Sequence, residues 1–217
     1  TVTPLANEDW QNSWKRHFKT ERISERLVIK PSWETFTAVP GDCVIEIDPG
    51  MSFGTGRHFT TRSCLQQLDR LSRERPGASL CDVGCGSGIL AIGAALLGFG
   101  PIWAFDYDPD AVAIACENSE RNGMAGRITC TVADLSAMPT HGTHDVVCAN
   151  LLAVEHERFH AAIAPLVAPG GLLIIGGTMH PQYAPTLALY AAAGFSEVTQ
   201  QQDAEWTTAV LRRKETP

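Results

Sequence analysis

The stretch DVGCGSG, residues 82–88, carries the strongest structural signal in the sequence, because three glycines occupy alternate positions. The apolar run SLCDVG begins at Ser79, and a second apolar run, ILAIGAALL, begins at Ile89. Glycine lets a chain turn sharply from a strand into a helix, and it lets a ligand approach the backbone without meeting a Cβ atom. The stretch therefore predicts a ligand-binding turn. The alternative is a tight turn of the same shape that binds nothing.

The spacing of the glycines limits the class of ligand. Gly84, Gly86 and Gly88 follow the pattern G-x-G-x-G, whereas the dinucleotide fingerprint is G-x-G-x-x-G, so a dehydrogenase is a minor alternative. Asp106 ends the next apolar run about twenty residues further on, where a carboxylate accepts both hydroxyls of a ribose. Asp108 has two interpretations, a second ligand or the cap of the helix that follows.

Apolar runs alternate with amphipathic stretches from Ser79 onward, which is typical of a parallel sheet with crossover helices. We expect strands in residues 79–84, 101–106, 127–134, 144–150 and, after a turn at 168–171, 170–177, with two short strands upstream in 25–33 and 42–50. We expect helices in residues 58–74, 87–98, 109–123, 154–167 and 181–194. The last two expected strands, 196–202 and 205–214, are joined by a short polar turn with no helix between them and should pair antiparallel.

The expected fold is therefore α/β: a mostly parallel seven-stranded sheet with a C-terminal antiparallel hairpin and helices on both faces. This layout resembles the Rossmann-like class I methyltransferases. In such a sheet, Asp134 follows the third strand, where its side chain or the next amide could reach an adenine amino group; an ordinary turn carboxylate is the alternative. Asn150 ends the fourth strand, where a neutral amide could orient an amine beside a transferred methyl group; an ordinary asparagine turn is the alternative.

Further motifs extend the resemblance over nearly the whole chain. DPGMSFGTGRHFTT at 48–61, DVGCGSGILAI at 82–92 and ANLLA at 149–153 are similar to the methyltransferases of ribosomal protein L11, the PrmA family. The resemblance implies methyl transfer from S-adenosylmethionine to lysine or α-amino groups of a basic protein of the large ribosomal subunit. It also implies that the loop at 48–61 folds over the cofactor, which would be contacted by Phe53, Thr61, Gly84, Asp106 and Asn150.

Several side chains in or near this loop have two interpretations. Thr60 and Thr61 lie at the expected start of a helix, where their hydroxyls and free N–H groups could hold a carboxylate or could only cap the helix. His58 fits a solvated or backbone-bonded histidine better than a catalytic base, and we name no base. Arg57 should face solvent or pair with a carboxylate. Trp33 could line the acceptor channel or pack under the loop.

Composition limits the possible partners. The chain has 217 residues, 44% of them hydrophobic, and a net charge of -7, which fits one globular domain without the basic stripe that a direct nucleic-acid partner requires. Seven cysteines without C-x-x-C or paired histidines predict reduced core residues and no metal site. The longest apolar run, 89–105, is broken by two glycines and Pro101, which argues against a membrane span. No signal peptide is visible, so we expect the protein to be located in the cytoplasm. We also expect it to be a monomer.

The sequence departs from the family pattern in two places. Family members carry a separate N-terminal domain that recognises the ribosomal protein, whereas only a few residues precede EDWQNSWK at 8–15. We therefore expect residues 1–47 to form an N-terminal extension or linker that packs on the core, and 48–217 to form the methyltransferase domain. The family's GIL segment is GTM at 177–179. Methylation of another protein or a small molecule, and cofactor binding without turnover, are the alternative functions.

Overall fold

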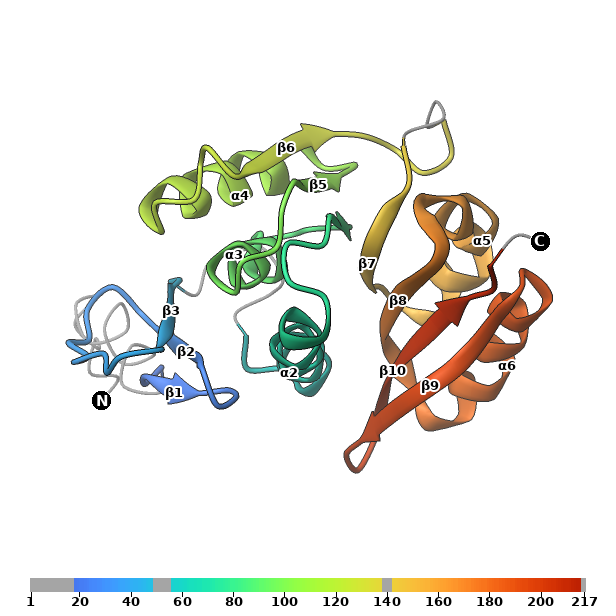
Figure 1. Ribbon diagram of the computed structural model, residues 1–217, viewed down its shortest axis with the longest axis horizontal. Coiled ribbons are helices and arrows are strands. Elements are labelled where there is room, and N and C mark those ends of the chain that lie inside the picture. The colour runs from blue at the N-terminus through green and yellow to red at the C-terminus, as the bar shows by residue number, and fades with distance from the viewer. Residues whose placement is uncertain (1–17, 49–55, 138–141, 216–217) are drawn as a thin grey trace, which may run out of the picture.

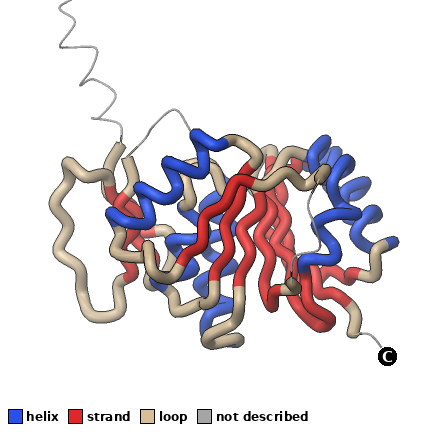
Figure 2. The backbone as a smooth tube through the Cα atoms, turned by 90° about the horizontal axis from the view of Figure 1, so that it is seen from above, coloured by secondary structure: helices blue, strands red, loops and turns tan. Residues whose placement is uncertain are grey.

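The computed structural model describes residues 18–48, 56–137 and 142–215. They form a seven-stranded sheet covered by helices on both faces, with a separate three-stranded sheet beside it (Figures 1 and 2). The three-stranded sheet comes from the N-terminal part of the chain and lies at one end of the molecule in Figure 1.

The large sheet comprises β4 (Leu80–Val83), β5 (Ile102–Asp106), β6 (Ile128–Val132), β7 (His144–Asn150), β8 (Val167–Met179), β9 (Phe195–Gln202) and β10 (Trp206–Arg213). The small sheet comprises β1 (Glu21–Arg22), β2 (Leu27–Lys30) and β3 (Cys43–Glu46). The helices are α2 (Phe59–Glu74), α3 (Ile89–Leu96), α4 (Pro109–Arg121), α5 (Ala153–Ile163), the short 3-10 helix η2 (Ala164–Leu166) and α6 (His180–Ala192). Within the described ranges, no helix is long and apolar enough to cross a membrane.

The strand order of the large sheet is β6-β5-β4-β7-β8-β10-β9. Strands β4 to β8 pair in parallel, and β10 is antiparallel to both β8 and β9, so the predicted fold class and C-terminal hairpin are confirmed. One local difference concerns the turn expected at 168–171. His144 pairs with Val167 and Val146 pairs with Leu172, so this segment is a bulge inside β8. Between these two pairs β7 advances by two residues and β8 by five, so three extra residues are accommodated without ending the strand.

Side chains of the central strands point alternately into two apolar layers, which explains why β8 reads as a continuous apolar run. The layer that includes α2 and α3 receives Val146, Cys148, Leu172 and Ile174. The layer that includes α5 and α6 receives Val147, Ala149, Leu173 and Ile175. Both faces of a parallel strand are buried in such a sheet, and the side-chain period of two assigns neighbours to opposite layers.

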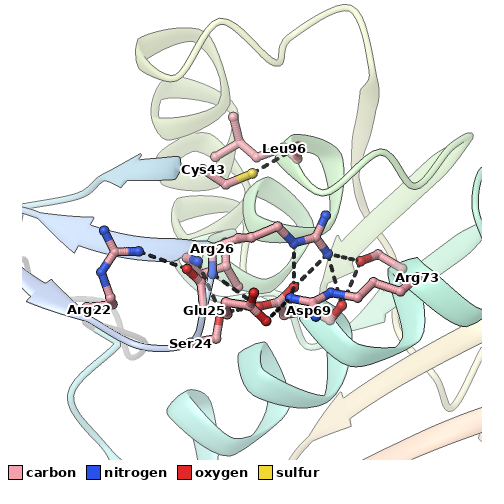
Figure 3. A network of polar contacts seen from close by, with 10 residues as sticks. Arg22, Ser24, Glu25, Arg26, Cys43, Asp69, Arg73 and Leu96 are labelled. Atoms are coloured by element: carbon pink, nitrogen blue, oxygen red, sulfur yellow. Dashed lines mark hydrogen bonds and ion pairs between the residues drawn. The ribbon is translucent and has the colours of Figure 1, made fainter. Parts of the chain in front are cut away.

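The small sheet is attached to α2 by a buried carboxylate (Figure 3). Asp69 of α2 is 3% exposed and accepts hydrogen bonds from Ser24 Oγ at 2.5 Å and from Arg26 Nε at 2.7 Å. Burial alone would raise the pKa of Asp69, but the hydrogen bonds from Ser24 and Arg26 outweigh it and hold the pKa below its ordinary value. Leu27 and Ile45 add fully buried side chains to the α2 and α3 layer.

We expect Asp69→Asn to lower the free energy of unfolding by about 2 kcal/mol at neutral pH, because the variant leaves the Arg26 guanidinium without its counter-charge. A carboxyl whose pKa is lowered by folding stabilises the fold above its unfolded pKa, and this contribution is lost as the pH falls through the folded pKa. The difference between parent and variant should therefore persist down to about pH 4 and shrink below it, as urea unfolding at several pH values would measure.

Glu74→Gln is the matched control, because the Arg70–Glu74 pair lies on the same helix with both side chains about half exposed. It should cost less than about 0.5 kcal/mol. Equal losses for the two variants would contradict a special role for the buried carboxylate.

Candidate functional site

The candidate site lies at the edge of the large sheet where the parallel strands end at their carboxyl termini. Strand β4 has β5 on one side and β7 on the other, so the chain order reverses between β4 and β7. Ligands of open α/β sheets bind in the crevice at such a reversal. Gly84 follows β4, Asp106 ends β5 and Asn150 ends β7, so the structure brings these three predicted residues to one edge.

The glycine-rich turn is tightly packed and uses the left-handed backbone region. Gly84, Gly86 and Gly88 have φ angles of 65°, 52° and 78°. A Cβ atom at Gly84 would lie 2.6 Å from Leu151 Cδ2, and one at Gly88 would lie 3.0 Å from the Cβ of Ala115. Only glycine fits this backbone without strain, and the turn leads directly into the first residue of α3.

Asp106 ties this turn to the beginning of α4. Its side chain is nearly buried; Oδ2 accepts a hydrogen bond from the Gly86 N–H at 3.0 Å, and Oδ1 accepts one from the Asp108 N–H at 3.1 Å. A carboxylate oxygen has two lone pairs, so each oxygen keeps the capacity for another donor. Asp108 accepts from the Asp110 N–H at 2.9 Å as the N-cap of α4, which is the capping interpretation made from the sequence.

Asp82 is a buried carboxyl that sequence reasoning missed. It is 1% exposed, and its Oδ2 accepts a hydrogen bond from the Ala91 N–H in the first turn of α3 at 3.1 Å. Burial raises the pKa of Asp82 to about 7, and the negative charge of Asp106 adds to this rise. The available signal was an acidic residue inside the apolar run SLCDVG. Asp82 anchors α3 to β4 beneath the turn.

Asn150 has one half of its amide paired and the other half without a partner. Its Nδ2 donates to Thr61 Oγ1 of α2 at 3.3 Å. Its Oδ1 is buried and accepts no hydrogen bond from any residue that the structure describes. A buried acceptor without a donor costs free energy, so a ligand that supplies an N–H or O–H there would relieve the cost. The arrangement fits the predicted orienting role.

The start of α2 is capped by a histidine. His58 is the N-cap residue; its Nδ1 accepts from the Thr60 N–H at 3.4 Å and lies 2.9 Å from Thr60 Oγ1. The N-cap residue is therefore His58 and not a threonine, and a role of the two threonines in holding a carboxylate stays a prediction. Thr61 is instead buried and turned toward Asn150. Arg57 is exposed, as expected, with its guanidinium 4.4 Å from the centre of the Phe18 ring.

The remaining predicted positions are less informative. Asp134 is exposed and accepts a hydrogen bond from the Ser136 N–H at 2.8 Å, which lowers the pKa of Asp134; its adenine contact stays a prediction. Phe53 lies outside the described residues. Trp33 is half-buried, and both of its interpretations stay open. At the departure from the family pattern, Thr178 is fully buried and donates to the Thr207 carbonyl at 3.0 Å, so its side chain belongs to the sheet.

Solved structures match the fold. The ribosomal protein L11 methylase from Lactobacillus delbrueckii subsp. bulgaricus superposes with a TM-score of 0.80 at 26% identity, over 91% of this chain and 99% of that chain. The N-methyltransferase NodS from Bradyrhizobium japonicum, in complex with S-adenosyl-l-homocysteine, superposes with a TM-score of 0.57 at 19% identity, over 73% of this chain and 90% of that one. The second likeness shows the fold alone.

Sequence relatives are closer. The family model described as ribosomal protein L11 methyltransferase (PrmA) matches residues 1–214. A ribosomal protein L11 methyltransferase of Geobacter sp. (strain M21) is 45% identical over 98% of this chain and 69% of its own length. Another, of Pelotomaculum thermopropionicum, is 41% identical over 97% of this chain and 67% of its own length. The chain belongs to the ribosomal protein L11 methyltransferase (PrmA) family, and it has the class I methyltransferase fold that the sequence predicts.

Proposed function

We propose that this methyltransferase transfers methyl groups from S-adenosylmethionine to lysine and α-amino groups of ribosomal protein L11, with residues 48–217 as the catalytic domain. Residues 1–47 would serve as the extension or linker. The observation that carries the proposal is the pairing of a glycine-rich turn with an unpartnered amide oxygen across the reversal between β4 and β7. A monomeric, cytoplasmic enzyme without a direct nucleic-acid contact stays our expectation.

The cofactor would be held on the β4 and β5 side of the reversal. Gly84 and Gly86 give the turn its left-handed backbone, and Asp106 has a free lone pair on each oxygen for the two ribose hydroxyls. Thr61 and Phe53 would contact the methionine part, and Asp134 or the following amide would meet the adenine. When bound, S-adenosylmethionine supplies a methyl group on a positively charged sulfur.

The acceptor amine would be oriented on the β7 side. A lysine has an ordinary pKa near 10.4 and must lose its proton before its nitrogen can attack a methyl group. Asn150 Oδ1 would accept a hydrogen bond from the neutral amine and so direct the nitrogen lone pair toward the methyl carbon. The chain contributes orientation and exclusion of water, and no dedicated base is needed.

The direct test is transfer of a radiolabelled methyl group to ribosomal protein L11 purified from cells that lack this methylation. We expect label in methylated lysine or in the methylated α-amino group after acid hydrolysis. Label that appears only on another protein or on a small molecule would show that L11 is not the substrate. Binding of S-adenosylhomocysteine without label on any acceptor would favour a cofactor-binding module without turnover.

Asp106→Ala should weaken binding of S-adenosylhomocysteine at least about tenfold, because two hydrogen bonds to a charged acceptor are lost. Isothermal titration would measure the affinity, and thermal unfolding would check the fold. Asp110→Ala is the matched control, since it removes the same charge from the exposed first turn of α4. Parental affinity in Asp106→Ala would mean that the site has been assigned wrongly, as would binding of NAD.

Asn150→Ala should lower kcat about a hundredfold while the affinity for S-adenosylhomocysteine changes by less than about threefold, because the amide orients the acceptor more than it binds the cofactor. Steady-state kinetics with L11 and titration of the product would give the two values. The exposed Glu157→Ala, on α5, serves as the control. A kcat within about threefold of the parent would remove Asn150 from the proposed reaction.

A further inference from the structure

We propose that His156 is a positioning residue for methyl transfer. It holds the segment of β8 around Gly176, against which the Asn150 amide rests. The inference builds on the proposed role of Asn150. It starts from a buried polar chain that the proposed reaction does not otherwise use, Tyr190–His156–Gly176.

His156 is completely buried on α5, beneath the ends of β7 and β8. Its Nε2 lies 3.0 Å from the carbonyl oxygen of Gly176, and its Nδ1 lies 2.9 Å from the hydroxyl of Tyr190. A carbonyl only accepts, so Nε2 must carry a proton. Burial lowers the pKa of His156 to about 4, so the ring is neutral and Nδ1 accepts from Tyr190. One tautomer therefore satisfies both contacts.

Gly176 is the point where β8 leaves regular pairing. In the ladder with β10, Thr207 pairs with Thr178 and Ala209 pairs with Ile175, so β8 carries an extra residue between these pairs. Bulges of this kind re-aim side chains next to active sites. The N–H group that donates to the Gly176 carbonyl belongs to His156 on α5, in one of the two helix layers that cover the sheet. His156 thus ties the bulge to α5.

The Asn150 side chain rests directly on this bulge. Asn150 pairs with Gly176 across the β7–β8 ladder, and a Cβ atom at Gly176 would lie 2.5 Å from Asn150 Oδ1. At the next residue, a Cβ on Gly177 would lie 2.1 Å from the carbonyl oxygen of Leu151. The bulge and the chain after Asn150 are therefore in close contact, and a shift of Gly176 displaces the unpartnered oxygen.

Two substitutions separate the contacts of the ring. His156→Gln keeps an N–H near the position of Nε2 and so preserves the bond to Gly176. His156→Asn keeps a polar group near the position of Nδ1 and so preserves the bond to Tyr190, but it cannot reach Gly176. Both variants replace a buried ring by a smaller amide, so their losses of packing are similar. Tyr190→Phe removes only the hydroxyl that pairs with Nδ1.

We expect His156→Asn to lower kcat by about tenfold to a hundredfold with an unchanged affinity for S-adenosylhomocysteine, since small misplacements of orienting groups cost this much. His156→Gln and Tyr190→Phe should stay within about threefold of the parent. The side-chain amide signal of Asn150, assigned in ¹⁵N spectra with Asn150→Ala, should shift or broaden in His156→Asn of the free protein and persist in the other two.

Equal kcat and equal Asn150 signals in the Asn and Gln variants would overturn the inference, and so would a Tyr190→Phe protein that matches His156→Asn. In the parent, ¹⁵N spectra of the His156 imidazole must show the proton on Nε2. A proton on Nδ1 would overturn the inference even where a variant fails to fold. If the parent does not methylate L11, the proposed function fails, while the amide signal still decides whether His156 positions Asn150.

Discussion

The two hydrogen bonds that hold the Asp106 carboxylate are the constraint on which the site depends. They attach two backbone segments to one side chain: the glycine-rich turn after β4, and Asp108, the N-cap residue of α4. The backbone carbonyl of Asp106 also accepts from the Ala133 N–H at 2.9 Å, which adds the chain that leaves β6. The ends of three strands are thereby joined at one residue, which holds the carboxylate in one place as binding of a ribose would require.

The β7 side of the reversal is built by close backbone approach. Leu151 leaves no room for a side chain at Gly84, and Asn150 leaves none at Gly176, so the turn packs against Leu151 and the β8 bulge packs against Asn150. The hydrogen bond from Asn150 to Thr61 connects this half to α2. The two sides of the reversal are therefore joined by close packing through Asn150 and Leu151.

Local patterns in the sequence predicted the sheet, the hairpin and the positions of Gly84, Asp106 and Asn150, because glycine spacing and strand ends are properties of short segments. Features without a distinctive local pattern were missed. The cap formed by His58 breaks the usual preference for serine, threonine and aspartate. Asp82 is unusual because it is buried. The bulge at Gly176 follows from the pairing of β8 with β10, and His156, which bonds to it, lies twenty positions earlier in the chain.

A crystal structure of the chain with S-adenosylhomocysteine and a lysine-bearing peptide of L11 would test the central claim most directly. The account predicts that both Asp106 oxygens lie within hydrogen-bond distance of the ribose hydroxyls, and that Asn150 Oδ1 accepts a hydrogen bond from the lysine nitrogen beside the sulfur. A ribose bound away from Asp106, or a lysine nitrogen held by other groups while Asn150 Oδ1 pairs within the protein, would contradict it.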